Sequence, residues 1–192
     1  MGQLTASTTD DAHALLADIK AQKAQLIKEG KLRKEKPLPP IKPEEIPFEI
    51  PENWVWCRVG EIGEVKRGKS PIYSNVGNFI ILNQKCVRWF DVEVEYGKVV
   101  NQEWYESLSE DSLLEEFDIL VNSTGDGTIG RSAIADEKCK GLPFDSHILR
   151  IRSIIESKYI CYLINSNFGQ QLVSLSKGAT STKQTELGVN NL

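Results

Sequence analysis

Apolar residues near the start of the chain recur at alternating steps of three and four. The pattern is formed by the apolar residues Ala12, Leu15, Ile19 and Leu26, and the polar Gln22 occupies the position between the last two. Such spacing places one apolar seam along a helix, where it can pack on a partner helix. We predict a helix over residues 12–30, because Thr8, Thr9 and Asp10 offer N-caps and Gly30 offers an end. A helix of ~20 residues spans ~30 Å, which suits a spacer; a surface helix packed on its own domain is the alternative.

After this helix, the chain changes character twice. Residues 31–45 are basic and then rich in proline, which imposes an extended, helix-free connector. Beyond it, short strand-like runs are separated by glycine, asparagine and proline signals. The strands predicted from these runs cover residues 54–59, 78–82, 87–94, 118–121, 132–135 and 148–151.

The end of the chain returns to a helical pattern. Ser157 offers an N-cap, apolar residues from Ile160 to Leu175 recur near helical spacing, and we expect a break at residues 165–169. The predicted fold class is α+β, a β-rich domain with a closing helical stretch, preceded by a long helix as a coiled-coil arm. The expected divisions are a leader at 1–11, the helix at 12–30, the linker at 31–45, the domain at 46–187 and a truncated second spacer region at 188–192.

The composition fits one domain with a helical arm. Of the 192 residues, 40% are hydrophobic and 26% charged, and no apolar run approaches the ~20 residues that cross a bilayer. The four cysteines (Cys57, Cys86, Cys139 and Cys161) lie far apart, which argues against a zinc site or a disulfide framework. The polar N-terminus does not read as a signal peptide, so we expect a cytoplasmic protein with reduced thiols and no membrane partner.

Charge is distributed unevenly along the chain. The net charge is -4, although binders of duplex DNA usually carry a basic excess. Residues 66–90 and 157–185 contain basic residues and no acid, whereas residues 91–118 contain ten acids and one lysine. This segregation favours a positive face for phosphates, with the acidic segment kept away from it or turned to a protein partner. Ordinary charge clustering on a solvated surface is the alternative.

Two glycine motifs formally match nucleotide-binding patterns. Residues 63–70 fit the P-loop pattern, yet Pro71 and the turn signals after it offer no helix to face a phosphate. Residues 125–130 fit G-x-G-x-x-G, but a strand-like run follows them, and Asp126 would point negative charge toward a pyrophosphate. We interpret the second motif as a tight hairpin-like turn and expect no nucleotide cofactor.

Residues that build common catalytic centres are sparse. His13 lies on the predicted helix and His147 precedes a strand, so they form no metal cluster and activate no nucleophile. Asp126 and the run 136–138 are too sparse for a nuclease pattern, and a methyltransferase motif is missing. We expect no catalysis, no bound metal and no cofactor.

Three polar clusters have the chemistry that recognition of duplex DNA uses. Lysine and arginine contact phosphates, arginine also forms paired hydrogen bonds with guanine edges, and an aspartate can accept a hydrogen bond from cytosine. The residues expected to touch DNA are Lys66, Arg67, Gly68, Lys69, Ser70, Arg88, Thr124, Asp126, Thr128, Arg131, Lys177, Thr180, Ser181, Thr182 and Lys183. Each cluster alone also fits an ordinary polar loop.

The last nineteen residues consist mainly of small and hydroxyl side chains with two lysines. Their Gly-Ala-Thr-Ser run resembles the end of a target-recognition domain in the DNA-specificity subunit of type I restriction-modification enzymes. Residues 26–41 and 46–62 resemble the end of that family's spacer and the beginning of its domain, in the family's order. The resemblance covers nearly the whole chain from about residue 12, and it is weakest over residues 70–118, where members that read different DNA would differ.

The resemblance implies a non-catalytic recognition subunit. In that family, two recognition domains held apart by antiparallel spacer helices read the halves of a split double-stranded DNA target. They also anchor methyltransferase subunits, and a translocating restriction subunit joins them. The seam of Ala12, Leu15, Ile19 and Leu26 would pair with a second spacer or with another copy of this chain.

Other interpretations stay open at this point. The end at Leu192 fits a fragment, a half-subunit that dimerises or a product of gene rearrangement. A protein-interaction adaptor with incidental basic loops is the competing class of function. A P-loop-like nucleotide-binding enzyme is the third.

Overall fold

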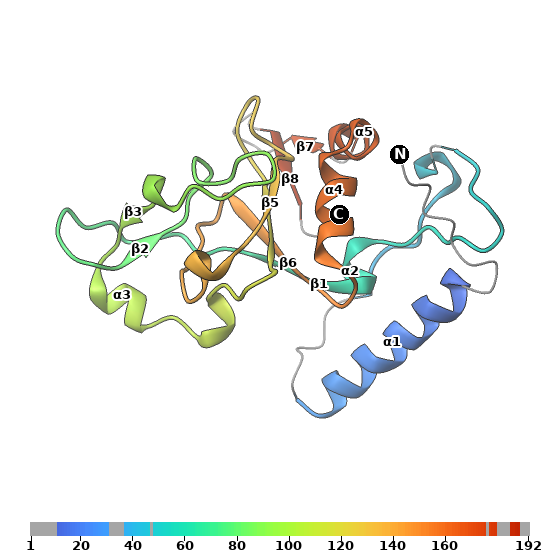
Figure 1. Ribbon diagram of the computed structural model, residues 1–192, viewed down its shortest axis with the longest axis horizontal. Coiled ribbons are helices and arrows are strands. Elements are labelled where there is room, and N and C mark those ends of the chain that lie inside the picture. The colour runs from blue at the N-terminus through green and yellow to red at the C-terminus, as the bar shows by residue number, and fades with distance from the viewer. Residues whose placement is uncertain (1–10, 31–36, 47, 176, 180–184, 189–192) are drawn as a thin grey trace. The chain divides into compact units, whose positions relative to one another are not determined.

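A computed structural model of the chain describes residues 11–30, 37–46, 48–175, 177–179 and 185–188 (Figure 1). It forms two compact units, residues 1–62 and residues 63–192. The expected domain at 46–187 therefore begins inside the first unit. Asn53 and Glu61 belong to that unit because both contact its helix α1 (Ala12–Lys28): the Ala12 N–H donates to the Asn53 carbonyl over 3.0 Å, and Glu61 pairs with Lys20 at 2.7 Å.

The predicted N-terminal helix is present as α1. Its N-cap is Asp11, whose carboxylate accepts from the His13 N–H at 2.9 Å, and not one of the predicted caps Thr8, Thr9 and Asp10, which lie outside the described residues. Gly30 has a φ of +71°, the left-handed conformation that ends many helices. The start and end of α1 thus follow from local sequence.

The rest of the first unit is short and irregular. It contains the 3-10 helix η1 (Pro43–Glu45) and the single turn α2 (Val59–Ile62). The Arg58 guanidinium joins them, since it donates to the Pro39 carbonyl at 2.8 Å and pairs with Glu45 at 3.0 Å. The strand predicted at 54–59 was wrong: no strand lies among the described residues of this unit, and the apolar run leads into α2 instead.

A four-stranded antiparallel sheet organises the second unit, in the order β1-β6-β4-β5 (Figure 1). Its strands are β1 (Gly63–Arg67), β4 (Ile119–Asn122), β5 (Ser132–Ile134) and β6 (Ile148–Ser153). Two small antiparallel ribbons accompany it, β2 (Ile80–Ile81) with β3 (Lys98–Val99), and β7 (Lys177–Ala179) with β8 (Thr185–Leu187). Short helices fill the connections: α3 (Gln102–Glu106), η2 (Val94–Tyr96), η3 (Glu110–Ser112) and η4 (Glu137–Cys139).

The sheet is covered on both faces. The closing helices α4 (Ser157–Asn165) and α5 (Asn167–Leu175) follow β6, and Asn165 of α4 bonds both backbone groups of Ser132 on edge strand β5, at 3.0 and 2.7 Å. On the opposite face, Leu120 and Ile148 join a buried cluster with side chains such as Leu82, Leu114 and Phe144 from the connections. The helical break falls between α4 and α5, within the predicted residues 165–169.

Strand predictions in the second unit succeeded where a run pairs with a distant strand. β4, β5 and β6 confirm the runs at 118–121, 132–135 and 148–151, and β2 lies inside the run at 78–82. The strand predicted at 87–94 was wrong, because Val87 forms a bridge with Val92 of the same run and the segment folds back on itself. β1 was missed, because its residues lie inside the glycine motif at 63–70.

The α+β fold class is confirmed by this arrangement. Residues 63–67 of the P-loop-like motif form a strand, and the described residues from Ser70 to Phe79 contain no helix. The motif at 125–130 lies in the connection between the antiparallel strands β4 and β5, so it is the expected hairpin-like turn. Among the described residues, no helix is long and apolar enough to cross a bilayer.

Candidate nucleic-acid interface

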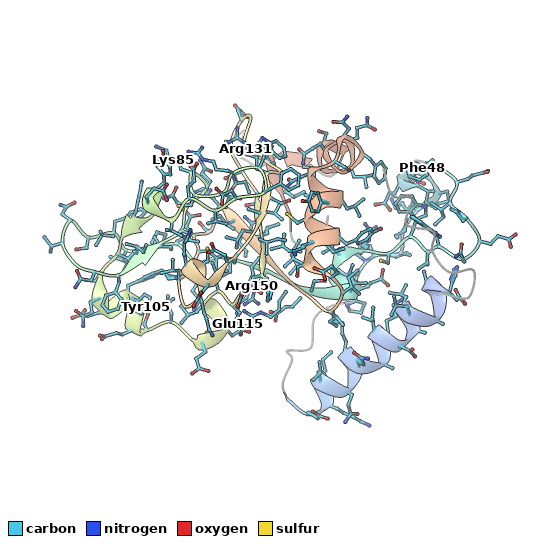
Figure 2. All side chains as sticks on the ribbon, viewed as in Figure 1. Phe48, Lys85, Tyr105, Glu115, Arg131 and Arg150 are labelled. Carbon is cyan, nitrogen blue, oxygen red and sulfur yellow. The ribbon has the colours of Figure 1, made fainter. Side chains whose placement is uncertain are left out.

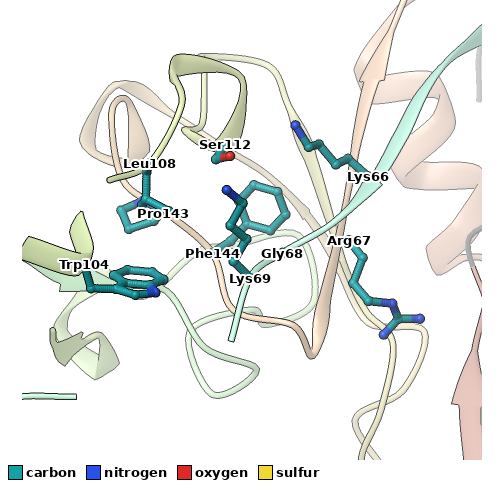
Figure 3. Close-up of a pocket in the computed structure, with 9 residues that line it drawn as sticks. All are labelled: Lys66, Arg67, Gly68, Lys69, Trp104, Leu108, Ser112, Pro143 and Phe144. Carbon is teal, nitrogen blue, oxygen red and sulfur yellow. The ribbon is translucent and has the colours of Figure 1, made fainter. Parts of the chain in front are cut away.

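Lys66 and Arg67, which the sequence groups together, leave β1 on opposite sides (Figure 3). Successive side chains of a strand alternate between the faces of its sheet. The Lys66 ammonium forms an ion pair with the Asp111 carboxylate and donates to the Asp111 carbonyl at 3.1 Å. Lys66 also lines a small recess with Lys69 and Trp104. Its charge is thus partly neutralised within the chain.

The Lys66 face of the sheet carries a row of ion pairs. Arg150, the strand neighbour of Lys66 on β6, is fully buried and pairs with Glu64 of β1. Arg152 binds Asp118 through two hydrogen bonds of 2.9 and 2.8 Å, and it pairs with Glu115 at 2.9 Å. Figure 2 shows Arg150 and Glu115 on the side of the unit away from Lys85 and Arg131.

These ion pairs explain the acidic run at residues 91–118. Asp111, Glu115 and Asp118 belong to it, and they neutralise cations of the sheet. Burial opposes ionisation of Asp111, but Lys66 and the nearby charges of Arg150 and Arg152 outweigh it and hold the pKa of Asp111 below its ordinary value. The acidic run was expected to lie away from the positive face or to meet a protein partner. Part of it instead stabilises the fold through these ion pairs.

Arg67 gathers several loops at one end of the sheet. Its Nη1 donates to the Ser123 hydroxyl at 3.1 Å and to the Ser146 carbonyl at 3.0 Å. Its Nη2 donates to the carbonyl of Leu187, at the end of β8, over 3.0 Å. The Leu187 N–H in turn donates to the Ser123 carbonyl at 2.8 Å. One side chain therefore connects β1, the β4–β5 loop, the segment before β6 and the β7–β8 ribbon.

Gly68 extends this junction through close packing. Its N–H donates to the Ile148 carbonyl at 3.1 Å, and a Cβ atom would collide with the carbonyl oxygens of Phe144 and Asp145. Gly68 was expected to touch DNA, and in the structure it allows the close approach of two backbones. Lys69 beyond it is exposed, and the Ser70 hydroxyl lies 3.4 Å from that of Ser146.

The β4–β5 loop is held by its own polar groups. Gly125, Gly127 and Gly130 have φ values of +97°, +77° and +83°, as the tight turn requires. The Thr128 hydroxyl donates to the Thr124 carbonyl at 3.1 Å, and Arg131 donates to the Gly127 carbonyl at 3.0 Å.

Two members of this loop differ in their surroundings. The Arg131 guanidinium lies 5.9 Å from the centre of the Trp89 ring. Asp126 is exposed and forms no ion pair with another described residue. The loop thus presents one stacked cation and one solvated acid at the same end of the sheet.

The basic residues of the neighbouring loop also differ. Arg88 pairs with Glu93 at 2.6 Å and lies 5.0 Å from the centre of the Tyr96 ring, so its charge is locally balanced. Lys85 is exposed, and its side chain forms no ion pair with a described residue. Figure 2 shows Lys85 on the same side of the unit as Arg131. Lys85 was missed in the sequence because nothing local distinguishes it from a solvated lysine.

The structure also assembles a polar network that sequence reasoning missed. The Thr124 hydroxyl lies 2.9 Å from His147 Nδ1 and donates to Gln84 Oε1 at 3.2 Å. The sequence excludes His147 from a metal cluster or a catalytic pair and assigns it no other contact. No signal in the sequence indicates this meeting, because Gln84 and His147 are separated by more than sixty residues.

The third predicted cluster is described only in part. Lys177 begins β7, so its backbone belongs to the β7–β8 ribbon. Thr180, Ser181, Thr182 and Lys183 lie outside the described residues. The contacts of Leu187 with Arg67 and Ser123 nevertheless fix the end of β8 beside the other loops.

The apolar seam of α1 is split by the fold. Ile19 is 3% exposed, whereas Leu15 is 55% exposed; Ala12 and Leu26 are half-buried. Within the first unit α1 contacts α2, and Lys23 donates to the Gly60 carbonyl at 2.5 Å. The exposed Leu15 side chain can therefore pack on another protein surface.

Burial shifts the pKa values of several titratable groups in this unit. Burial raises the pKa of Asp145, although the His147 N–H, 2.8 Å from its carboxylate, opposes this shift. The four cysteines are free thiols, and burial raises the pKa of Cys139 to about 11. Within the described part of the chain, no group of three or more His, Cys, Asp or Glu could hold a metal ion.

Known proteins resemble this chain in sequence and in structure. A family model described as the type I restriction modification DNA specificity domain matches residues 51–188. The specificity subunit of the type I restriction enzyme EcoEI from Escherichia coli is 32% identical over 205 aligned positions, which cover 100% of this chain and 34% of that protein. The EcoAI specificity subunit of the same organism is 38% identical over 134 positions, covering 65% of this chain and 23% of that protein.

Solved structures share the fold at low sequence identity. The HsdS subunit from Thermoanaerobacter tengcongensis superposes with a TM-score of 0.51 at 14% identity, over 92% of this chain and 41% of that one. A chain from a structure on complex assembly and conformational transition of the type I R-M system gives a TM-score of 0.52 at 15% identity, over 94% of this chain and 40% of that one.

The family match covers most of this chain, whereas this chain covers only part of its relatives. This chain spans about a third of the length of the EcoEI relative. Residues 51–188 include the whole sheet, the Arg67 junction and the loops that it gathers. The chain therefore belongs to the family of type I restriction modification DNA specificity domains.

Proposed function

We propose that this chain is the DNA-recognition part of a type I restriction-modification specificity subunit and reads one half of a split duplex target. One observation carries the proposal: within the stretch that matches the DNA specificity domain, Arg67 at the end of β1 joins the β4–β5 loop, the segment before β6 and the β7–β8 ribbon at one end of the sheet. Loops positioned by a rigid scaffold are a common site of binding residues.

The charges around the loops support contact with phosphates. Lys69 and Lys85 are exposed and form no ion pair with a described residue, and Arg131 and Lys177 lie on the connected loop and ribbon. Lysines and arginines of this kind fix a protein on the DNA backbone, while other groups read the bases. These cations support contact with phosphates although the net charge of the chain is -4.

The remaining roles follow from the family. The chain acts in the cytoplasm without catalysis, metal or cofactor. It anchors methyltransferase and restriction subunits and determines the DNA sequence that they recognise. The recognition domain spans residues 46–187, and α1 is its spacer. The named E. coli relatives are specificity subunits, which supports this division of labour.

Selection of duplexes from a randomised pool tests the proposal. The full chain, alone and with methyltransferase subunits, is expected to enrich one short sequence, and the enriched duplexes should dissociate as salt rises. Equal recovery of all sequences in both conditions would contradict the proposal. ATP binding is measured in parallel, since tight binding of ATP by the isolated chain would favour the nucleotide-binding alternative.

Self-association through α1 requires a separate test. Leu15→Glu places a charge on the exposed part of the seam, so it should reduce association with a second copy or a partner helix. Ala17→Glu is the matched control, because Ala17 is exposed on the same helix outside the seam. Identical elution of wild type and Leu15→Glu in a sizing experiment would remove the seam from the proposal.

A further inference from the structure

Three polar side chains from three different loops meet at the hydroxyl of Thr124. This hydroxyl donates to Gln84 Oε1 at 3.2 Å and lies 2.9 Å from His147 Nδ1. Thr124 is nearly buried, Gln84 is half-exposed and His147 is exposed. The network therefore connects the interior of the loop junction with solvent.

The direction of the bond from Thr124 to Gln84 assigns the tautomer of the neutral imidazole. A threonine hydroxyl has one hydrogen, and that hydrogen goes to Gln84. Thr124 must then accept the second bond, so His147 Nδ1 carries a hydrogen and donates it. In a neutral imidazole the other nitrogen, Nε2, is then a hydrogen-bond acceptor. Gln84 Nε2 keeps two hydrogens, and neither it nor His147 Nε2 has a partner among the described residues.

The backbone around these side chains is fixed. The buried Asn122 donates to the Gln84 carbonyl at 3.0 Å, and the Ser123 N–H donates to the His147 carbonyl at 2.9 Å. Asp145, also buried, accepts from the His147 N–H at 2.8 Å. Because Arg67 binds Ser123 and Ser146, it holds the residues directly before Thr124 and before His147. Binding would require little further ordering of this backbone.

We infer that His147 and Gln84, held by Thr124, read a base that carries an exocyclic amino group in the major groove. This inference rests on the proposed function. Adenine N6 and cytosine N4 are donors, and they match the acceptor at His147 Nε2. Guanine O6 and thymine O4 are acceptors, and their lone pairs would face that of Nε2. Adenine also offers the acceptor N7 to the Gln84 amide, so it can use both groups.

The network thus separates base reading from phosphate binding. A lysine such as Lys85 neutralises any phosphate and carries no sequence information. His147 Nε2 distinguishes amino from keto groups, because the hydroxyl of Thr124 sets which nitrogen carries the hydrogen. Thr124 is a positioning residue, since it acts through His147 and Gln84.

Duplex selection with the full chain tests this assignment. His147→Phe keeps a ring without nitrogen, so preference for the amino-bearing base should fall about tenfold at one position of the selected sequence. His147→Leu, which also lacks a side-chain nitrogen, serves as a second variant, and thermal unfolding establishes that each is folded. Lys85→Ala is the control, expected to weaken binding to all sequences alike. Unchanged preference in a folded His147 variant, or an equal loss at every position, overturns the inference.

Two variants of Thr124 distinguish a positioning role from simple structural support. Thr124→Val removes the hydroxyl at nearly constant volume, so it should relax preference at the same position as His147→Phe. Thr124→Ser keeps the hydroxyl and should retain the wild-type preference. Equal behaviour of Thr124→Ser and Thr124→Val would overturn the role of the hydroxyl.

The outcomes also separate the inference from the proposed function. If the wild-type chain enriches a sequence and folded His147 variants enrich the same one with equal preference, the inference fails and the proposed function stands. If the wild type enriches no sequence with or without methyltransferase subunits, both fail.

Discussion

The two neighbouring basic residues of β1 have opposite surroundings. Lys66 faces the side of the sheet where Asp111, Glu115 and Asp118 neutralise Arg150 and Arg152. Arg67 faces the loop junction, where it donates to a hydroxyl and to two carbonyl oxygens. One position along a strand therefore separates a cation in an ion-pair row from a cation that organises loops.

This difference shows what a basic residue in a DNA-binding sequence can do. A lysine or arginine is available for phosphate only if the fold leaves its charge unpaired and exposed. Lys69 and Lys85 meet this condition among the described residues, whereas Lys66, Arg88 and Arg150 are paired with acids. Substitutions of paired and unpaired residues can test that separation, and those with the largest expected effect come first.

Loss of Arg150 should have the greatest effect on stability. Arg150 is 0% exposed, so Arg150→Met leaves Glu64 without its buried partner and should lower the free energy of unfolding by about 3–5 kcal/mol. Urea denaturation measures this loss. The double variant Arg150→Met/Glu64→Met should recover much of it, because it removes both charges. A double variant as unstable as the single one would show that the pair itself is not the cause.

Arg67→Ala should affect both the fold and binding. The hydrogen bonds of a charged guanidinium to the loops are removed, and we expect a decrease of about 2 kcal/mol in the free energy of unfolding. Because the loops separate, affinity for the selected duplex should fall as well. Arg67→Lys is the control, since it keeps the charge but cannot make the same set of bonds. Wild-type stability in Arg67→Ala would exclude its role in joining the loops.

Lys69→Ala and Lys85→Ala should change binding and leave stability unaffected. Each removes an exposed cation, so the slope of log affinity against log salt should decrease by about 0.9 for each phosphate that the variant no longer neutralises. Lys66→Ala is the matched comparison, and its slope should stay near that of wild type because Asp111 pairs with Lys66. Equal slopes for Lys66→Ala and Lys85→Ala would break the distinction between a lysine paired with an acid and an exposed lysine without an ion pair among the described residues.

Asp111→Asn should have a small effect that depends on pH. The pKa of Asp111 is lowered in the folded state, so its ionised form stabilises the fold above the unfolded pKa of about 3.9. This contribution is lost as pH falls through the folded pKa. Since Asp111 is half-exposed, we expect less than about 1 kcal/mol at neutral pH. Urea unfolding at pH 7 and at low pH should show the difference between wild type and variant disappear in acid; a constant difference would contradict it.

Local patterns were sufficient for several elements. Asp11 and Gly30 bound α1, the glycines at 125–130 turn between β4 and β5, and the break between α4 and α5 falls where the apolar spacing weakens. Each depends on groups close in sequence, because caps and tight turns are made by neighbouring residues. The strand predictions for residues 54–59 and 87–94 were wrong because a strand needs a partner strand, which local propensity does not specify.

The candidate site shows the same division between local and distant causes. The α+β class, the resemblance to specificity subunits and the three polar clusters could all be read from the order of the amino acids. The side of β1 that each cation takes, the pairing of residues 91–118 with the sheet and the meeting of Gln84, Thr124 and His147 emerged only when the chain was folded. Ion pairs and hydrogen bonds depend on distances of about 3 Å between atoms, and the register of distant strands sets those distances.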